Sequence, residues 1–310
     1  MSTQEASQAI LYGAALGDAL GWPVEFLSRR KMKAIYGPGG IQEPPDPALF
    51  TDDTQMTLAL DEALVEVGDA DMNSLMEATV RHFVAWKNAP ETTERKPGHT
   101  VLDAVRMLES GTPWQDAGIV TKGCGSAMRV SGIGFLYQAD PDRLRDVAHH
   151  SGLVTHNHPT ADAGTIAAAY LVKLALDGVH PDEYLRQAML FVDGISEEFD
   201  EAMLRVGHVL GWSDEEAATD HLGKGWTAEE AVAIAVYCVM RYPDDYVTAV
   251  RRAANIPGDS DSVACIAGGI MGARLGLEAI PGDWIARLEK LDYLTDVANR
   301  LAAQKQAIYG

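Results

Sequence analysis

Apolar residues recur along most of this chain at the three- and four-residue spacing of amphipathic helices, as Leu58, Leu60, Leu64 and Val67 illustrate. No segment shows the alternation that a convincing pair of β-strands would require. The expected fold class is therefore all-α. The periodicity predicts helices near residues 5–20, 54–67, 72–87, 99–110, 125–137, 141–151, 159–177, 181–193, 198–210, 227–241, 244–255, 261–276 and 283–303.

Composition describes a folded protein with an acidic surface. The chain has 310 residues, of which 47% are hydrophobic, enough for a substantial core. Asp and Glu number 45 against 25 Lys and Arg, a net charge of −20 with no long basic run. Binding to nucleic acid, which needs clustered cations, is therefore not expected.

Cysteine usage and the N-terminus favour a soluble cytoplasmic protein. The three cysteines, Cys124, Cys238 and Cys265, show neither zinc-site nor disulfide spacing, which suits a reducing compartment. The first residues lack the pattern of a signal peptide, and no apolar run reaches the length of a membrane span. We expect no membrane partner, and the oligomeric state is left open.

The segment Thr51-Asp52-Asp53-Thr54 precedes one of the predicted apolar helices. Asp52 and Gln55 have the spacing of a capping box, so one reading is simply a helix cap. A cap needs only one short polar side chain, however, and adjacent carboxylates repel each other. A bound cation would remove that repulsion, whereas the helix dipole favours each acid by only roughly 0.3–1 kcal/mol.

A second acidic segment, Gly258-Asp259-Ser260-Asp261-Ser262, precedes an apolar helix of small residues suited to burial. Carboxylates at a buried helix start are costly unless they are paired. Asp259 and Asp261 can point to one side of a turn, with the hydroxyl of Ser260 or Ser262 beside them, although capping by one Asp explains the pattern too. Oxygen donors of this kind suit Mg²⁺, and paired-metal sites hold ions roughly 3.5–4 Å apart.

The two acidic segments lie near opposite ends of the chain but must meet if they share metals. The turn-rich breaks at residues 37–40, 43–47, 90–98 and 223–225 are short, and none resembles a flexible linker. A single compact helical domain spanning residues 1–310 is the most economical arrangement. The sequence thus predicts a paired-metal hydrolytic site inside one domain.

Two further acids lie near the N-terminus. Glu25 follows Trp22 and Pro23 and is expected on a loop, where it is either a mobile metal ligand or general base, or an exposed surface residue. Asp18, at the end of the first predicted helix, is expected to be structural.

The central third of the chain offers a glycine-rich loop and a histidine run. Residues 123–129 can cradle a phosphate at a helix start, but close helix packing explains small residues equally well. Cys124 is either a nucleophile or, as we favour, a small buried thiol. His156 and His158 lack the partners of a recognised zinc site, so hydrogen bonding to a ligand or to the helix start is favoured over zinc ligation and over purely structural capping.

Taken together, these segments resemble the ADP-ribosylglycohydrolase family in their order and spacing. The resemblance runs from about residue 8 to residue 276 and rests on residues 13–21 with Glu25, 51–54, 123–130, 155–156 and 258–262. It implies an all-α, compact single-domain orthogonal helical bundle. It also implies a binuclear Mg²⁺ site, with Mn²⁺ as the alternative ion, in a central cleft.

The family resemblance assigns roles to individual residues. The implied metal ligands are Thr51, Asp52, Asp53, Asp259, Asp261 and Ser262. The implied contacts to ADP-ribose are Gly123, Cys124, Gly125, Ser126, Met128 and His156. Glu25 and Asp261 are the implied catalytic acids.

The reaction implied is hydrolysis of the glycosidic bond between ADP-ribose and a modified acceptor, with protein arginine favoured. A hydrolase of serine-linked or O-acetyl ADP-ribose, another Mg²⁺-dependent phosphoesterase and a non-catalytic ADP-ribose binder are the alternatives. The chain departs from the family pattern at Cys124, Pro257, Ser260 and Ser262, and in the basic segment 94–100. These departures bear on which linkage is cleaved.

Overall fold

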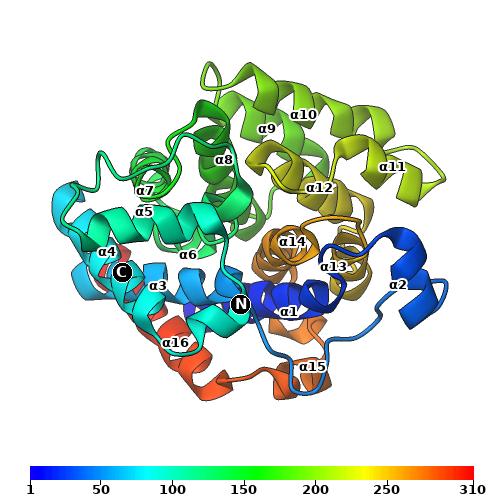
Figure 1. The fold of residues 1–310 in the computed structure, drawn as a ribbon, viewed down its shortest axis with the longest axis horizontal. Coiled ribbons are helices and arrows are strands. Elements are labelled where there is room, and N and C mark those ends of the chain that lie inside the picture. The colour runs from blue at the N-terminus through cyan, green and yellow to red at the C-terminus, as the bar shows by residue number, and fades with distance from the viewer.

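The expected all-α class is confirmed, because a computed structural model of residues 1–310 contains helices and only isolated β-bridges (Figure 1). The α-helices are α1 (Thr3–Gly21), α2 (Arg29–Tyr36), α3 (Asp52–Val67), α4 (Met72–Asn88), α5 (His99–Glu109), α6 (Ser131–Leu136), α7 (Pro141–Leu153), α8 (Pro159–Leu176), α9 (Tyr184–Phe191), α10 (Glu197–Val209), α11 (Glu215–Leu222), α12 (Ala228–Arg241), α13 (Tyr246–Ala254), α14 (Ser260–Leu275), α15 (Gly282–Arg287) and α16 (Leu291–Tyr309). Short 3₁₀ helices are η1 (Trp22–Val24), η2 (Thr92–Arg95), η3 (Cys124–Ser126), η4 (Pro181–Glu183) and η5 (Leu277–Ala279). No helix is both long and apolar enough to cross a membrane.

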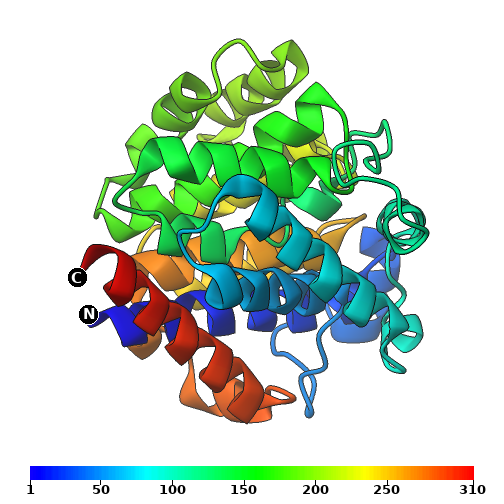
Figure 2. The same cartoon turned by 90° about the vertical axis from the view of Figure 1, so that its left-hand side faces the viewer.

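Helices α1 and α14 pack most extensively against each other and form the centre of the molecule (Figure 1). Helices α3 and α16 cover one side of this pair, and α8, α12 and α13 cover the other. Figure 2 places both termini on the same side of the molecule. The central pair matters for function because the end of α1 carries Asp18 and the start of α14 carries Asp261.

Glycines allow α1 and α14 to approach within backbone contact. A Cβ atom added to Gly268 would lie 2.0 Å from the carbonyl oxygen of Gly13, and one added to Gly17 would lie 2.0 Å from that of Ala264. Both obstacles are backbone atoms, which cannot rotate away as a flexible side chain can. The helix pair therefore fixes how the acidic ends of the two helices meet.

Replacing Gly268 by Val is expected to destabilise the protein by about 3 kcal/mol or more, because overpacking at a backbone contact must separate the two central helices. Urea denaturation measures the loss. The matched control is Gly207→Ala on α10, where nothing lies within 4 Å of an added Cβ. This control should be neutral or stabilising by up to about 1 kcal/mol, and equal losses in both variants would contradict the packing argument.

Helices α2 and α11 were not predicted, and two predicted helices are interrupted. Helix α2 is largely basic with only Met32 buried, so its sequence carries no apolar stripe. The predicted helix at 125–137 is in fact η3 followed by the short α6. The predicted helix at 283–303 divides into α15 and α16, since Lys290 adopts a left-handed conformation (φ 52°).

The break before α16 has a long-range cause. The Glu289 carboxylate accepts hydrogen bonds from the backbone N–H of Phe50 (2.9 Å) and from the guanidinium of Arg95 (2.6 Å). Leu288 pairs with Ala48 in an isolated bridge. These contacts come from segments some two hundred residues away in the chain, so no local pattern could have shown them.

Candidate active site

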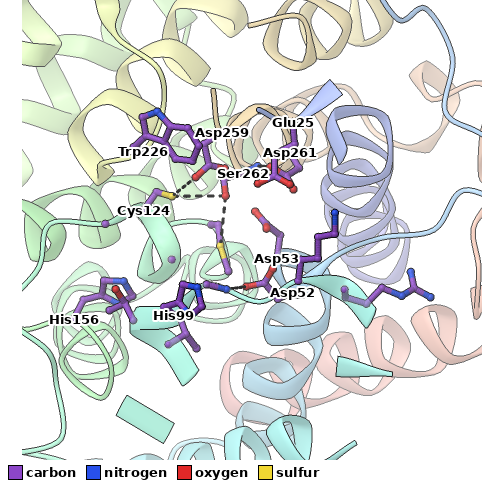
Figure 3. A pocket seen from close by; sticks show the side chains of 18 of the residues that line it. Glu25, Asp52, Asp53, His99, Cys124, His156, Trp226, Asp259, Asp261 and Ser262 are labelled. Atoms are coloured by element: carbon purple, nitrogen blue, oxygen red, sulfur yellow. Dashed lines mark hydrogen bonds between the residues drawn. The ribbon is translucent and has the colours of Figure 1, made fainter. Parts of the chain in front are cut away.

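A cleft of about 280 Å³ brings both acidic segments together (Figure 3). The residues that line it come from the loop after α1, the start of α3, the segment from η2 to the start of α5, the glycine-rich loop around η3, the turn after α7, the loop before α12 and the start of α14. They are Glu25, Phe26, Asp52, Asp53, Arg95, Lys96, Gly98, His99, Thr100, Val101, Gly123, Cys124, Gly125, Met128, His156, Trp226, Asp259, Asp261 and Ser262.

The start of α3 is capped by residues other than its two aspartates. Thr51 is the N-cap, and Asp18 of α1 accepts hydrogen bonds from the backbone N–H groups of Thr51 (2.9 Å) and Thr54 (3.0 Å) and from both hydroxyls. The expected structural role of Asp18 is confirmed by these bonds. Because Thr51 and Asp18 accept the capping hydrogen bonds, neither Asp52 nor Asp53 serves as the cap, and both residues line the cleft.

The capping box that Asp52 and Gln55 could form, the alternative reading of this segment, is not present. The helix begins at Asp52 itself, and the Gln55 side chain instead accepts a hydrogen bond from the indole N–H of Trp86 on α4 (2.9 Å). One Asp52 oxygen accepts from the backbone N–H of Gly98 at 3.3 Å. This bond ties the loop before α5 to the carboxylate cluster.

At the start of α14, Asp259 occupies the N-cap position, yet its side chain makes no capping hydrogen bond. Its carboxylate instead accepts from the Cys124 thiol across the cleft (3.0 Å). The two serines differ: Ser260 donates to the carbonyl of Gly21 (2.9 Å), whereas Ser262 lines the cleft. Capping therefore does not account for Asp259.

Glu25 lies directly after η1 and is half-buried at the edge of the cleft. The next residue, Phe26, takes the left-handed conformation (φ 60°) and donates its backbone N–H to the carbonyl of Gly258 (3.0 Å). This bond joins the Glu25 loop to the loop before α14. As a result, ligand atoms of Glu25, Asp259 and Asp261 all lie within 4.8 Å of one another.

Burial makes negative charge costly in this cluster. It is the main reason that the pKa of Asp52 is raised to about 7 and that of Glu25 to about 8, and the negative charges of Asp18 and Asp259 contribute to both shifts. The pKa values of Asp53 and Asp261 lie well above the usual range, for the same reason and through mutual repulsion. One Asp53 oxygen, Oδ1, is buried without any hydrogen-bond partner.

These carboxylates fit a divalent cation. The donor set is oxygen-rich, converging and repulsive, and hard cations such as Mg²⁺ or Mn²⁺ prefer it. The sequence-predicted ligands Asp52, Asp53, Asp259, Asp261 and Ser262 line the cleft. Thr51 lies behind them, with its hydroxyl donated to Asp18.

The glycine-rich loop is held from behind by Arg129, which is fully buried. Its guanidinium donates to the carbonyls of Gly125 (3.0 Å) and Ser151 (2.8 Å) and to the hydroxyl of Thr155 (2.8 Å). The organising role of Arg129 was not predicted, because a basic residue inside an apolar stretch gives no sign of its partners. The loop therefore presents a fixed surface to the cleft.

Most of the residues expected to contact ADP-ribose line the cleft, namely Gly123, Cys124, Gly125, Met128 and His156. Ser126 does not, since it is buried and its hydroxyl accepts from Thr165 (2.7 Å). Burial, and after it the negative charge of Asp259, raise the pKa of Cys124 well above its usual range. Cys124 is therefore a protonated thiol and not a ready nucleophile. The favoured reading of a buried thiol fits the structure.

The histidine run gives no zinc cluster. The sole group of converging metal-ligating side chains is that of Glu25, Asp259 and Asp261. His158 caps α8 by accepting from the backbone N–H of Thr160 (3.1 Å). Burial, together with the Arg129 charge, lowers the pKa of His156 to about 3, so His156 meets the cleft as a neutral ring.

An aromatic pair at the mouth of the cleft was not predicted. The rings of Phe26 and Trp226 stack with centroids 5.1 Å apart, and both side chains are exposed. They come from the loops after α1 and before α12. Single aromatic residues in loops cannot be told from core residues by sequence alone, so this pairing needed the fold.

Magnesium should stabilise the protein more strongly at about pH 8 than at about pH 6. Folding raises the pKa values of Asp52 and Glu25 above 3.8 and 4.5, so near pH 6 the folded cluster holds protons that a cation must displace. Thermal unfolding with Mg²⁺ and with EDTA at each pH measures this. Titrating groups outside the site affect the melting temperature equally with Mg²⁺ and with EDTA, so they cancel when the EDTA value is subtracted at each pH. An equal Mg²⁺-dependent shift of the melting temperature at both pH values would contradict the assignment of these carboxylates as Mg²⁺ ligands.

Comparisons with known proteins agree over the whole chain. The sequence model of the ADP-ribosylglycohydrolase family matches residues 1–309. An uncharacterised protein of Archaeoglobus fulgidus is 30% identical over 306 residues, covering 96% of each chain. The ADP-ribosylarginine hydrolase Tri1 of Serratia proteamaculans is 24% identical over 299 residues, 96% of this chain and 79% of that protein.

A solved structure shows the same architecture. An ADP-ribosylglycohydrolase-related protein complex superposes with a TM-score of 0.74 at 27% sequence identity, covering 98% of this chain and 99% of its own. The fold is thus shared over nearly the full length of both chains.

Proposed function

The chain belongs to the ADP-ribosylglycohydrolase family, whose members hydrolyse the glycosidic bond to ADP-ribose, and we propose that its own substrate is an ADP-ribosylated arginine of a protein. The observation that carries the proposal is the convergence of buried carboxylates from α3, α14 and the Glu25 loop on one cleft. The arginine linkage is supported by the relative from Serratia, which is named an ADP-ribosylarginine hydrolase. A cationic guanidinium also complements a protein with a net charge of −20.

Two Mg²⁺ ions, or Mn²⁺ in their place, are the proposed cofactor. We assign Asp52 and Asp53 at the start of α3, and Asp259, Asp261 and Ser262 at the start of α14, to hold them. Thr51, the remaining ligand expected from the sequence, donates its hydroxyl hydrogen to Asp18 and could offer a cation only the lone pairs of the same oxygen. When bound, the ions would supply Lewis acidity and positive charge beside the ribose. The positive charge of the ions would also relieve the repulsion among these carboxylates, which otherwise lack cationic partners.

The protein groups complete the reaction. The glycine-rich loop at Gly123 and Gly125 and the neutral His156 hold the ADP-ribosyl group. Glu25 accepts a proton from the attacking water as the new C–O bond forms at the anomeric carbon. That proton then goes to the guanidino nitrogen as its bond to the same carbon breaks, so free ADP-ribose and unmodified arginine leave.

A panel of defined conjugates tests this function. Peptides carrying ADP-ribose on arginine or on serine, and O-acetyl ADP-ribose, are incubated with Mg²⁺ or with EDTA. We expect intact ADP-ribose from the arginine peptide with Mg²⁺ and none with EDTA. Release of AMP or phosphate would identify a phosphoesterase instead, preference for serine would overturn the arginine assignment, and binding of ADP-ribose without turnover would exclude catalysis.

A further inference from the structure

A second hollow, of about 420 Å³, adjoins the catalytic cleft. Glu25, Phe26 and Lys96 line both hollows, so the two meet at the side chain to which we assign proton transfer. Beyond that boundary its walls are apolar. They are formed by Trp22, Pro23, Pro45, Pro47 and Leu49, and we call this hollow the proline groove.

The apolar side chains of the proline groove are not part of the protein's own core. Trp22, Phe26 and Leu49 neither belong to the core cluster nor pack against it, and Phe26 is 61% exposed. Exposed apolar surface beside a cleft is typical of a binding site. The groove is also held in shape, since Arg95 lies over the Trp22 ring (5.6 Å) and is paired with Glu289.

We propose that the proline groove binds the polypeptide of the ADP-ribosylated acceptor, as an extended segment that flanks the modified side chain. The inference rests on the proposed function, because it takes the bond to be cleaved to lie beside Glu25. The ADP-ribosyl group then occupies the side of Gly123 and His156, which line the cleft but not the groove. The acceptor must leave on the opposite side of Glu25, where the groove begins.

The groove chemistry suits side-chain contacts more than strand pairing. Pro45 and Pro47 have no backbone N–H to offer a bound strand, and Leu49 donates its own N–H to the carbonyl of Pro47 (3.1 Å). Recognition therefore depends on apolar side chains next to the modified residue. An acceptor with apolar flanking residues is the expected partner.

The test compares a large and a small substrate. Leu49→Asp, Leu49→Ala and the control Leu190→Asp are assayed on an ADP-ribosylated arginine peptide with apolar flanking residues and on the ADP-ribose conjugate of agmatine. Leu190 is a similarly apolar residue, 62% exposed on α9, that lines neither hollow. Thermal unfolding confirms that each variant is folded.

We expect Leu49→Asp to raise the KM for the peptide by about tenfold or more, Leu49→Ala to raise it less, and neither to change the kinetics on the agmatine conjugate. Equal effects on both substrates, or none on the peptide, would overturn the groove assignment while leaving the hydrolase intact. Loss of a dimer in Leu49→Asp with unchanged peptide kinetics would assign the groove to a second copy. A wild-type protein that cleaves neither conjugate would instead remove the proposed function, and the groove with it.

Discussion

Replacing Asp53 by Asn is expected to lower ADP-ribosyl hydrolysis by roughly 10³-fold, equivalent to about 4 kcal/mol of transition-state stabilisation. The reason is the position of Asp53 between the other carboxylates, with one buried oxygen that no protein group satisfies (Figure 3). The same change should raise the thermal stability of the protein in EDTA, because an amide cannot ionise and so avoids the cost of burying this carboxyl among like charges. Release of ADP-ribose and calorimetric unfolding in EDTA measure the two effects.

Asp61 provides the matched control. It lies on the same helix, α3, is buried to the same degree, and burial likewise raises its pKa well above the usual range. It does not line the cleft. Asp61→Asn should therefore leave hydrolysis unchanged, and an equal loss of activity in both variants would mean that Asp53 acts only through the fold.

Replacing Glu25 by Gln is expected to lower kcat by about 10²–10⁴-fold, the usual contribution of a general base. The affinity for ADP-ribose should change little, because Glu25 acts on the attacking water and the leaving group. Steady-state kinetics and calorimetry with ADP-ribose separate these effects. The control is Glu94→Gln, an exposed acid of η2 that lines neither hollow.

Glu25 has a second possible role as a metal ligand, because its carboxylate and those of Asp259 and Asp261 offer oxygen atoms within 4.8 Å of one another. Calorimetry with Mg²⁺ decides between the two roles. Retained Mg²⁺ affinity with a lower kcat supports the base, whereas a collapse of Mg²⁺ affinity would make Glu25 a ligand. An unchanged kcat would exclude it from the chemistry.

The sequence predicted what depends on local patterns. Helical periodicity predicted the all-α class and most helices, and motif order predicted the family. Paired acids at two helix starts also indicated that their carboxylates do more than cap a helix. Asp259 agrees with this prediction, because it occupies an N-cap position but its side chain makes no capping hydrogen bond.

What the sequence could not predict depends on contacts between distant segments. Asp18 on α1 joins Thr51 in capping α3, so the sequence alone could not show that Asp52 does not serve as the cap. The break at Lys290, the anchoring of the glycine-rich loop by Arg129 and the pairing of Phe26 with Trp226 are of the same kind. Each joins side chains whose neighbours along the chain give no sign of the partner.

We propose that carboxylates from α3 and α14 gather around a pair of divalent cations. The most direct measurement is anomalous X-ray scattering from crystals of the wild-type protein grown with Mn²⁺. We expect two peaks, roughly 3.5–4 Å apart, between Asp52 and Asp53 on one side and Asp259 and Asp261 on the other. A map without peaks at these side chains, at a Mn²⁺ concentration that supports hydrolysis, would contradict it.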